Sequence, residues 1–226
     1  MNNYSVILFD LDGTLTDSKL GITRCVQYAL DKLGRPERDL DKLEPFIGPP
    51  LQETFSSIYG FSEEEVSQAI GYYRERFKSV GMFENEVYPQ IRELLAELKE
   101  QNKRLIVATS KPTPFAEQIL RYFELDPYFE LIAGSNLDGT RASKTEVIAY
   151  VLGQLSGVDK QDVVMVGDRK HDIIGANNTG IHSIAVMYGY GSLEELQPVE
   201  PTYMVHSTAE LREVLSGKGE ALGSGR

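Results

Sequence analysis

The chain has 226 residues, 41% of them hydrophobic, and a formal net charge of −11. That length can bury a substantial core, in one large domain or two small ones. No apolar run approaches the roughly 20 residues that span a bilayer, and no basic segment precedes a hydrophobic one at the start. We therefore expect a cytoplasmic protein with no membrane partner. The acidic charge argues against a nucleic-acid polymer as partner, because phosphate backbones are bound by clustered Lys and Arg.

The first predicted strand runs from Val6 to Asp10 and leads into Asp10-Leu11-Asp12-Gly13-Thr14. Side chains at i and i+2 share one face of a strand, so Asp10 and Asp12 can converge. Two carboxylates that close repel each other unless a cation lies between them, which favours a hard metal such as Mg²⁺. The alternative is an ordinary Asp-Gly turn in which an aspartate caps a helix.

Residues 20–86 carry no strand pattern, and their apolar side chains recur at helical spacing, as in Ile22, Val26 and Ala29. We therefore predict an all-helical insert, with connections at residues 15–18 and 84–87 as candidate hinges. Cys25 lies in this pattern, where we expect a buried thiol. Candidates for substrate contact in the insert are Arg24, the Gly48-Pro49-Pro50 turn with Gln52, and Tyr72-Tyr73-Arg74. The alternatives are solvated arginines, core tyrosines and a turn that only separates helices.

After the insert, short apolar strands alternate with amphipathic helices. This alternation predicts right-handed crossovers and a parallel, doubly wound α/β sheet, whose ligands bind beyond the carboxyl ends of the strands. The predicted strands are Arg104 to Thr109, Leu131 to Ala133, Val163 to Asp168, Ile181 to Val186 and Tyr203 to Val205. The predicted helices are Ile91 to Gln101, Phe115 to Tyr122, Thr145 to Leu155, His171 to Asn178, and Ala209 to Leu215 with Ser207 as N-cap.

Three further groups follow strands or begin helices. Thr109 and Ser110 end a strand, where hydroxyls and helix amides could hold a phosphate, although either residue could instead cap the next helix. Lys144 begins a helix, where a lysine is unfavourable unless an anion compensates it; the alternative is a solvated lysine. Asp168 follows a strand, and Asp172 lies one helical turn later, so both could join a metal site with Asp10. An aspartate after a strand can also be a simple cap.

Together, these residues resemble the four successive motifs of the haloacid dehalogenase (HAD) superfamily, in the usual order, over about residues 5–215. The helical insert looks like the cap of the phosphoglycolate phosphatase and beta-phosphoglucomutase branch. Details such as Tyr188-Gly189-Tyr190-Gly191 resemble a bacterial subgroup described as phosphoglycolate phosphatase-like or as 5'-nucleotidase. The resemblance implies a Rossmann-like core at residues 1–17 and 87–216 and a helical cap domain at 18–86. The glycine-rich tail, 217–226, is expected to be disordered.

By this resemblance, Asp10 is the nucleophile of an aspartyl-phosphate mechanism, and Asp12 is the general acid and base. The implied phosphate-binding residues are Thr109, Ser110 and Lys144, and the implied Mg²⁺ site consists of Asp10, Asp12 through its backbone carbonyl, Asp168 and Asp172. Lys144 is followed by Thr145-Glu146 where many relatives have a proline soon after the lysine, so Lys111 and Arg141 are alternatives to it.

The predicted activity is hydrolysis of a small phosphorylated metabolite, such as phosphoglycolate or a 5'-nucleotide. Dehalogenases of the superfamily lack an acid at the position of Asp12, so its presence favours phosphoryl transfer. Two alternatives stay open: a phosphosugar mutase of the beta-phosphoglucomutase type, which shares every core motif, and a phosphate-binding protein without catalysis.

Overall fold

The computed structural model describes residues 3–216, and within them six strands form one sheet in the order β5-β4-β1-β6-β7-β8. Every neighbouring pair is parallel. All residues of the central strand β1 are fully buried, which explains its uninterrupted apolar sequence VILF. The strands are β1 (Val6–Phe9), β4 (Arg104–Pro112), β5 (Leu131–Ser135), β6 (Val163–Gly167), β7 (His182–Val186) and β8 (Tyr203–Val205).

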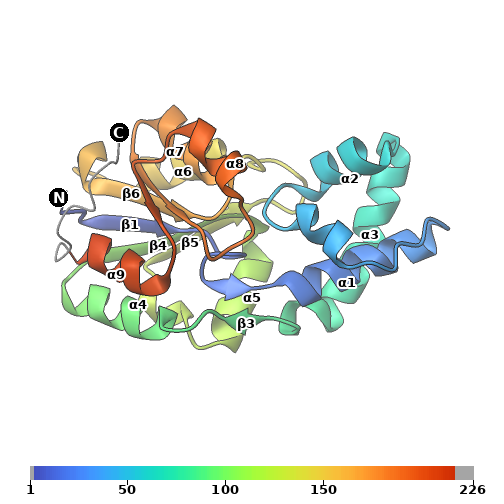
Figure 1. The fold of residues 1–226 in the computed structure, drawn as a ribbon, viewed down its shortest axis with the longest axis horizontal. Helices are drawn as coiled ribbons and strands as arrows, with labels where there is room; N and C mark the ends of the chain where they lie inside the picture. Colours follow the sequence, from blue (N-terminus) through green and yellow to red (C-terminus); the bar gives the residue numbers. More distant parts are fainter. Residues whose placement is uncertain (1–2, 217–226) are drawn as a thin grey trace.

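Helices cover both faces of this sheet (Figure 1). Ile7 and Phe9 of β1 pack in one hydrophobic cluster with α4, α5 and α9, whereas Val6 and Leu8 pack on the other face with α6 and α7. The predicted doubly wound α/β fold is therefore confirmed. The bounds are α4 (Ile91–Glu100), α5 (Thr113–Tyr122), α6 (Lys144–Gln154), α7 (Lys170–Thr179), α8 (Leu193–Leu196) and α9 (Thr208–Leu215).

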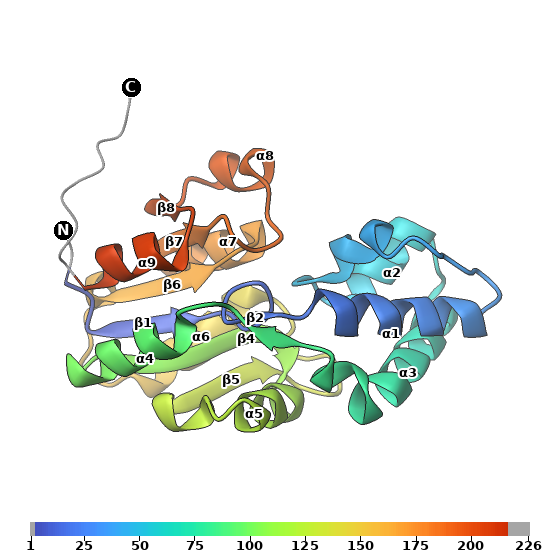
Figure 2. The same cartoon turned by 60° about the horizontal axis from the view of Figure 1, so that its bottom comes forward.

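The helical insert lies beyond the carboxyl ends of the strands (Figure 2). It contains α1 (Lys19–Lys32), α2 (Leu51–Tyr59) and α3 (Glu63–Ser79), and two short 3-10 helices, Asp41–Phe46 and Gly81–Phe83. Ser62 caps α3 in a capping box with Glu65. Cys25 is buried in the insert as predicted, and burial raises the pKa of its thiol to about 11. We use "insert" for residues 18–86; its standing as a separate domain stays a prediction.

The two connections of the insert pair with each other, which the sequence analysis missed. β2 (Thr16–Asp17) and β3 (Glu86–Val87) form an antiparallel ribbon in which Thr16 pairs with Val87 and Asp17 with Glu86. Strands of two residues are too short to show an alternating pattern, and this explains the omission. The insert is thus attached to the sheet at one place.

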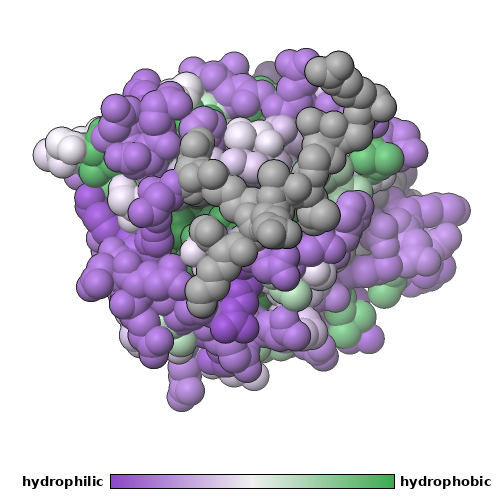
Figure 3. All heavy atoms as spheres, turned by 60° about the vertical axis from the view of Figure 1, so that its left-hand side comes forward, coloured by the Kyte–Doolittle hydropathy of each residue, from purple (hydrophilic) through white to green (hydrophobic). Residues whose placement is uncertain are grey.

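Other boundaries differ by a few residues. β4 continues to Pro112 instead of ending at Thr109: its register with β5 shifts after Ala108, and pairing resumes between Pro112 and Ser135. Ser207 caps α9 as predicted, accepting the Glu210 N–H. The expected disorder of 217–226 lies outside the described residues. Among residues 3–216, no helix is long and apolar enough to cross a membrane. Where described atoms are visible, the end of the sheet opposite the insert is mainly hydrophilic (Figure 3).

Candidate active site

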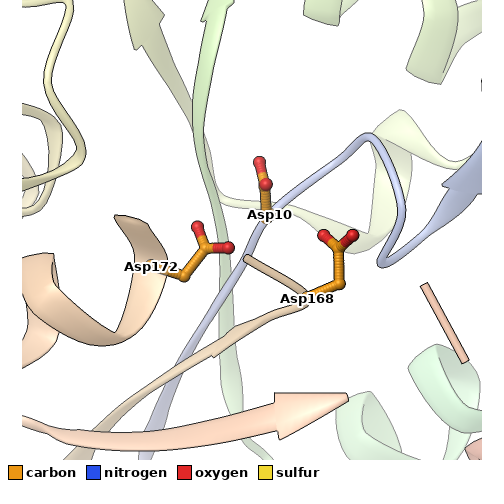
Figure 4. A group of neighbouring side chains, drawn as sticks. All are labelled: Asp10, Asp168 and Asp172. Carbon is orange, nitrogen blue, oxygen red and sulfur yellow. The ribbon is translucent and has the colours of Figure 1, made fainter. Parts of the chain in front are cut away.

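Three aspartates converge at the carboxyl ends of β1 and β6 (Figure 4). Asp10 follows β1, Asp168 follows β6, and Asp172 lies in the first turn of α7. One carboxylate oxygen from each lies within 4.8 Å of the other two, and all three side chains are buried. Because β1 and β6 are parallel neighbours, their ends bring these acids together. We call Asp10, Asp168 and Asp172 the acid cluster.

Lys144 provides a positive charge to the acid cluster. Its Nζ lies 2.8 Å from Asp10 Oδ1 and 2.8 Å from Asp172 Oδ1, and it donates to the Ala108 carbonyl at 3.0 Å. Burial alone would lower the pKa of this lysine, but the two aspartates outweigh burial and raise it. The lysine is 4% exposed, so the solvated alternative is wrong. Arg141 does not replace it, since its Nε donates to the Gly134 carbonyl.

Asp12 has different surroundings from Asp10. Its Oδ2 lies 2.8 Å from Lys111 Nζ, and that ammonium lies 4.7 Å from the ring centre of Phe77 in the insert. Asp12 Oδ1 is buried and accepts no hydrogen bond from the described residues. From the sequence, Lys111 is only an alternative to Lys144, whereas the structure pairs Lys111 with Asp12. Asp12 therefore has one oxygen held by a cation and one oxygen available.

The charges around these acids do not balance. Asp10, Asp12, Asp168 and Asp172 carry four carboxylates, whereas Lys111 and Lys144 supply two ammonium groups. Burial, opposed by Lys144, raises the pKa of Asp10 to about 6, and burial together with Asp172 and Asp10 raises the pKa of Asp168 well above its ordinary value. Two uncompensated negative charges among hard oxygen ligands fit one divalent cation such as Mg²⁺.

Asp168 is held by parts of the chain to which the sequence analysis gave no role. The Thr14 hydroxyl donates to its Oδ1 at 3.3 Å, and the backbone N–H of Tyr190 donates to its Oδ2 at 2.8 Å. Gly13 and Gly189 touch the same carboxylate so closely that a Cβ on either would lie 2.2 Å or 2.6 Å from Asp168 Oδ2. The Tyr188-Gly189-Tyr190-Gly191 motif was the available signal. From the sequence, this motif indicates a subgroup of the family, but it does not indicate a contact with Asp168.

Thr109 and Ser110 lie in the irregular part of β4, next to Ala108. Such irregularities re-aim side chains at sheet edges and sites. The Thr109 hydroxyl accepts the Lys111 N–H at 3.2 Å, and the Ser110 carbonyl accepts the Ser135 hydroxyl at 2.8 Å. Neither residue caps α5, whose N-cap is Pro112 without a side-chain hydrogen bond. The capping alternative is therefore wrong, and their predicted contact with phosphate stays a prediction.

A pocket that is partly open to solvent lies between the insert and the sheet. Its floor includes Asp12, Ser110 and Lys111. Most of its wall is apolar or aromatic, which is typical of sites that bind organic ligands. These wall residues are Ile22, Phe46, Pro49, Pro50, Leu51, Ile70, Tyr73, Phe77, Pro112 and Phe115.

The insert residues predicted to contact substrate divide into two groups. Those that line the pocket are Gly48, Pro49, Pro50, Gln52, Tyr73 and Arg74. Arg24 and Tyr72 do not line it, so their predicted place was wrong. Arg24 forms an ion pair with Glu84 at 2.7 Å, and Tyr72 packs against the hydrophobic core. Helical periodicity shows which side chains share a face but not what lies opposite that face.

The sequence matches the model of the family described as "Haloacid dehalogenase-like hydrolase" over residues 7–186, which include every predicted site residue. The chain belongs to this family. A 5'-nucleotidase of Pseudomonas aeruginosa is 49% identical over 94% of this chain and 96% of that protein. The tyrosine-protein kinase PtkA of Mycobacterium tuberculosis is 41% identical over 93% of this chain and 72% of its own.

A crystal structure from Clostridium acetobutylicum, described as a predicted phosphatase, has a TM-score of 0.92 and 48% identity, covering 95% of this chain and 99% of that chain. The predicted membership of the HAD family is therefore confirmed. The family, the 5'-nucleotidase relative and this neighbour together identify the chain as a HAD-type phosphatase.

Proposed function

We propose that this phosphatase hydrolyses small phosphomonoesters with Mg²⁺ through an aspartyl-phosphate on Asp10. The observation that carries the proposal is that Asp10 and Asp12 have different surroundings. Asp10 lies in the acid cluster beside Lys144, whereas Asp12 lines the pocket, pairs with Lys111 and has one buried oxygen without a hydrogen bond. Two carboxylates in different environments can take different roles, one as nucleophile and one as acid and base.

In the proposed first step, a carboxylate oxygen of Asp10 attacks phosphorus and the bond from phosphorus to the leaving oxygen breaks. Asp12, in its protonated form, donates its proton to that oxygen, so the alcohol leaves neutral. In the second step, Asp12 takes a proton from water, which attacks the phosphorus of the acyl phosphate. Inorganic phosphate leaves, and Asp10 and the protonated Asp12 are regenerated. Lys111 keeps the Asp12 side chain at the pocket floor.

The residues around Asp10 would hold the phosphoryl group. Thr109, Ser110 and Lys144 would bind its oxygens, which supplies local positive charge in an acidic protein. Asp10, Asp168, Asp172 and the backbone carbonyl of Asp12 would hold Mg²⁺, which when bound would neutralise charge on the transferring phosphoryl oxygens. The three close carboxylates and the two uncompensated negative charges support this assignment.

The pocket favours a leaving group with a planar or apolar surface. Four aromatic rings line it, Phe46, Tyr73, Phe77 and Phe115, together with several aliphatic side chains. Glycolate has two carbons and a carboxylate, so it would leave most of this wall without contact. A nucleoside offers a base that stacks on aromatic rings and a ribose that forms hydrogen bonds with groups such as Gln52. We therefore propose nucleoside monophosphates ahead of phosphoglycolate, in line with the 5'-nucleotidase relative.

The test is a phosphate-release screen of the purified chain on nucleoside 5'-monophosphates, phosphoglycolate, sugar phosphates and an aryl phosphate, with Mg²⁺ or with EDTA. We expect Mg²⁺-dependent release, with the highest kcat/KM on a nucleotide. Full activity in EDTA would contradict the metal, and a preference for phosphoglycolate would contradict the substrate class. Isomerisation of a sugar phosphate without net release would instead indicate the mutase.

A further inference from the structure

Two residues beside the acid cluster each contact one of its aspartates through the main chain, and the insert or its attachment through the side chain. The backbone N–H of Arg169 donates to Asp172 Oδ2 at 3.0 Å, and its Nη1 donates to the Ile47 carbonyl in the insert at 2.5 Å. The backbone N–H of Tyr190 donates to Asp168 Oδ2 at 2.8 Å, and its hydroxyl donates to Asp17 Oδ1 at 2.5 Å. Asp17 belongs to β2, the strand that leads into the insert.

We propose that Arg169 and Tyr190 are positioning residues that couple the placement of the insert to the geometry of Asp168 and Asp172. Neither residue needs to touch substrate for this role. In each case the main chain holds a carboxylate of the acid cluster and the side chain holds the insert or the strand leading to it. The inference rests on the proposed function, since it assigns Mg²⁺ binding to those carboxylates.

The contact of Arg169 with the insert is close, and Glu195 holds the guanidinium on its other side. A Cβ on Gly48 would lie 2.8 Å from Arg169 Cγ, so the turn after Ile47 rests on the arginine stem. On the other side, Glu195 Oε1 accepts from Arg169 Nε at 2.8 Å and from the Lys170 N–H at 3.0 Å. The guanidinium is therefore fixed toward the Ile47 carbonyl. A displaced turn would break this hydrogen bond.

Tyr190 is also held closely, at its hydroxyl by the attachment of the insert and at its backbone by Asp168. Its hydroxyl accepts the Lys19 N–H at 3.0 Å while it donates to Asp17, so it lies between the last residue of β2 and the first of α1. Next to it, a Cβ on Gly191 would lie 1.9 Å from the Asp168 carbonyl oxygen. No side chain separates this loop from Asp168. A shift at the attachment of the insert would therefore reach the carboxylate through one residue.

Coupling of this kind is reciprocal: if the position of the insert changes the affinity for Mg²⁺, then Mg²⁺ changes the order at the attachment. Tyr190→Phe removes the hydroxyl and keeps the backbone N–H to Asp168. We expect Mg²⁺ affinity, measured by calorimetry without substrate, to fall about 3- to 10-fold. A change of this size corresponds to the net free energy of one hydrogen bond. In hydrogen exchange, Mg²⁺ should slow the Lys19 amide less in Tyr190→Phe than in the unchanged protein, because only its hydrogen bond to Asp17 Oδ1 at 3.1 Å remains.

The matched control is Tyr28→Phe, which also removes a tyrosine hydroxyl that donates to a carboxylate. That hydroxyl donates to Glu75 Oε1 at 2.8 Å, within the insert, and does not reach the acid cluster. Arg169→Gln should act as Tyr190→Phe does. Its control is Arg104→Gln, because Arg104 pairs with Glu130. We expect both controls to bind Mg²⁺ within twofold of the unchanged protein.

The inference is overturned if Tyr190→Phe binds Mg²⁺ as tightly as the unchanged protein, or if Tyr28→Phe weakens binding as much. It is also overturned if Mg²⁺ slows the Lys19 amide equally in Tyr190→Phe. These results would leave Mg²⁺-dependent phosphate release intact and so would not touch the proposed function. Failure of the unchanged protein to bind Mg²⁺ would overturn both.

Discussion

Replacing Lys144 with methionine would leave two buried carboxylates without their shared cation. Lys144 Nζ lies 2.8 Å from both Asp10 and Asp172, and none of the three side chains is more than 4% exposed. Removing one partner of a buried ion pair costs about 3–5 kcal/mol, because the remaining charge keeps its desolvation penalty. We expect a loss of this size in the free energy of unfolding of the metal-free protein at pH 8.

The loss should be smaller at low pH. The pKa of Asp10 is already about 6 with Lys144 in place, and without the ammonium it rises further. At pH 5.5 Asp10 in the variant is therefore mostly protonated and needs no cation, whereas at pH 8 more of the penalty remains. Urea unfolding in EDTA at both values measures the difference.

Lys103→Met is the matched control. Lys103 is also a buried lysine, but its Nζ donates to neutral oxygens, Asn3 Oδ1 at 2.5 Å and the Tyr4 carbonyl at 2.7 Å. Its removal leaves no unpaired charge, so we expect a loss of about 1–2 kcal/mol that changes little with pH. Equal losses for Lys144→Met and Lys103→Met, or a larger Lys144→Met loss at pH 5.5 than at pH 8, would refute the reasoning.

Three further predictions concern turnover and the metal. Asp10→Asn should abolish phosphate release. Asp12→Asn should lower kcat about 100- to 10,000-fold and leave Mg²⁺ affinity, measured by calorimetry, nearly unchanged. A wild-type rate in Asp12→Asn would contradict the proposed role of Asp12. Gly189→Ala should weaken Mg²⁺ binding about 10- to 100-fold, since its Cβ would lie 2.6 Å from Asp168 Oδ2. Calorimetry should also show Mg²⁺ affinity decreasing below about pH 6, where protons compete for Asp10; constant affinity from pH 5 to 8 would disagree.

The sequence predicted the parts of the site that depend on a single strand or helix. Asp10 and Asp168 follow apolar strands, and a parallel sheet places the carboxyl ends of its strands at one edge, so a shared site for these two aspartates could be inferred; that β1 and β6 are neighbours comes from the structure. Lys144 could be inferred because a lysine at a helix start is unfavourable unless an anion compensates it. In these cases the charge of the side chain, at a strand end or a helix start, is itself the signal in the sequence.

Contacts that any residue type could make were not predictable in this way. Asp168 is held by the backbone N–H of Tyr190, and nearly every amino acid has such a group. The wrong placement of Arg24 has a related cause, since its partner Glu84 lies 60 residues away and no local pattern links them. The ribbon of β2 and β3 also joins distant segments, through only two residue pairs.

That ribbon brings the two ends of the insert next to each other. Thr16 lies opposite Val87 and Asp17 opposite Glu86, so the chain leaves the sheet and returns to it as neighbouring strands. A two-residue hairpin turn could join such strands, and it would replace the whole of α1 to α3. Exchange of residues 18–85 between related chains would then change the wall of the pocket while β1, β4 and β6 keep their places. New substrate preferences could thus arise by replacement of one continuous segment of the gene.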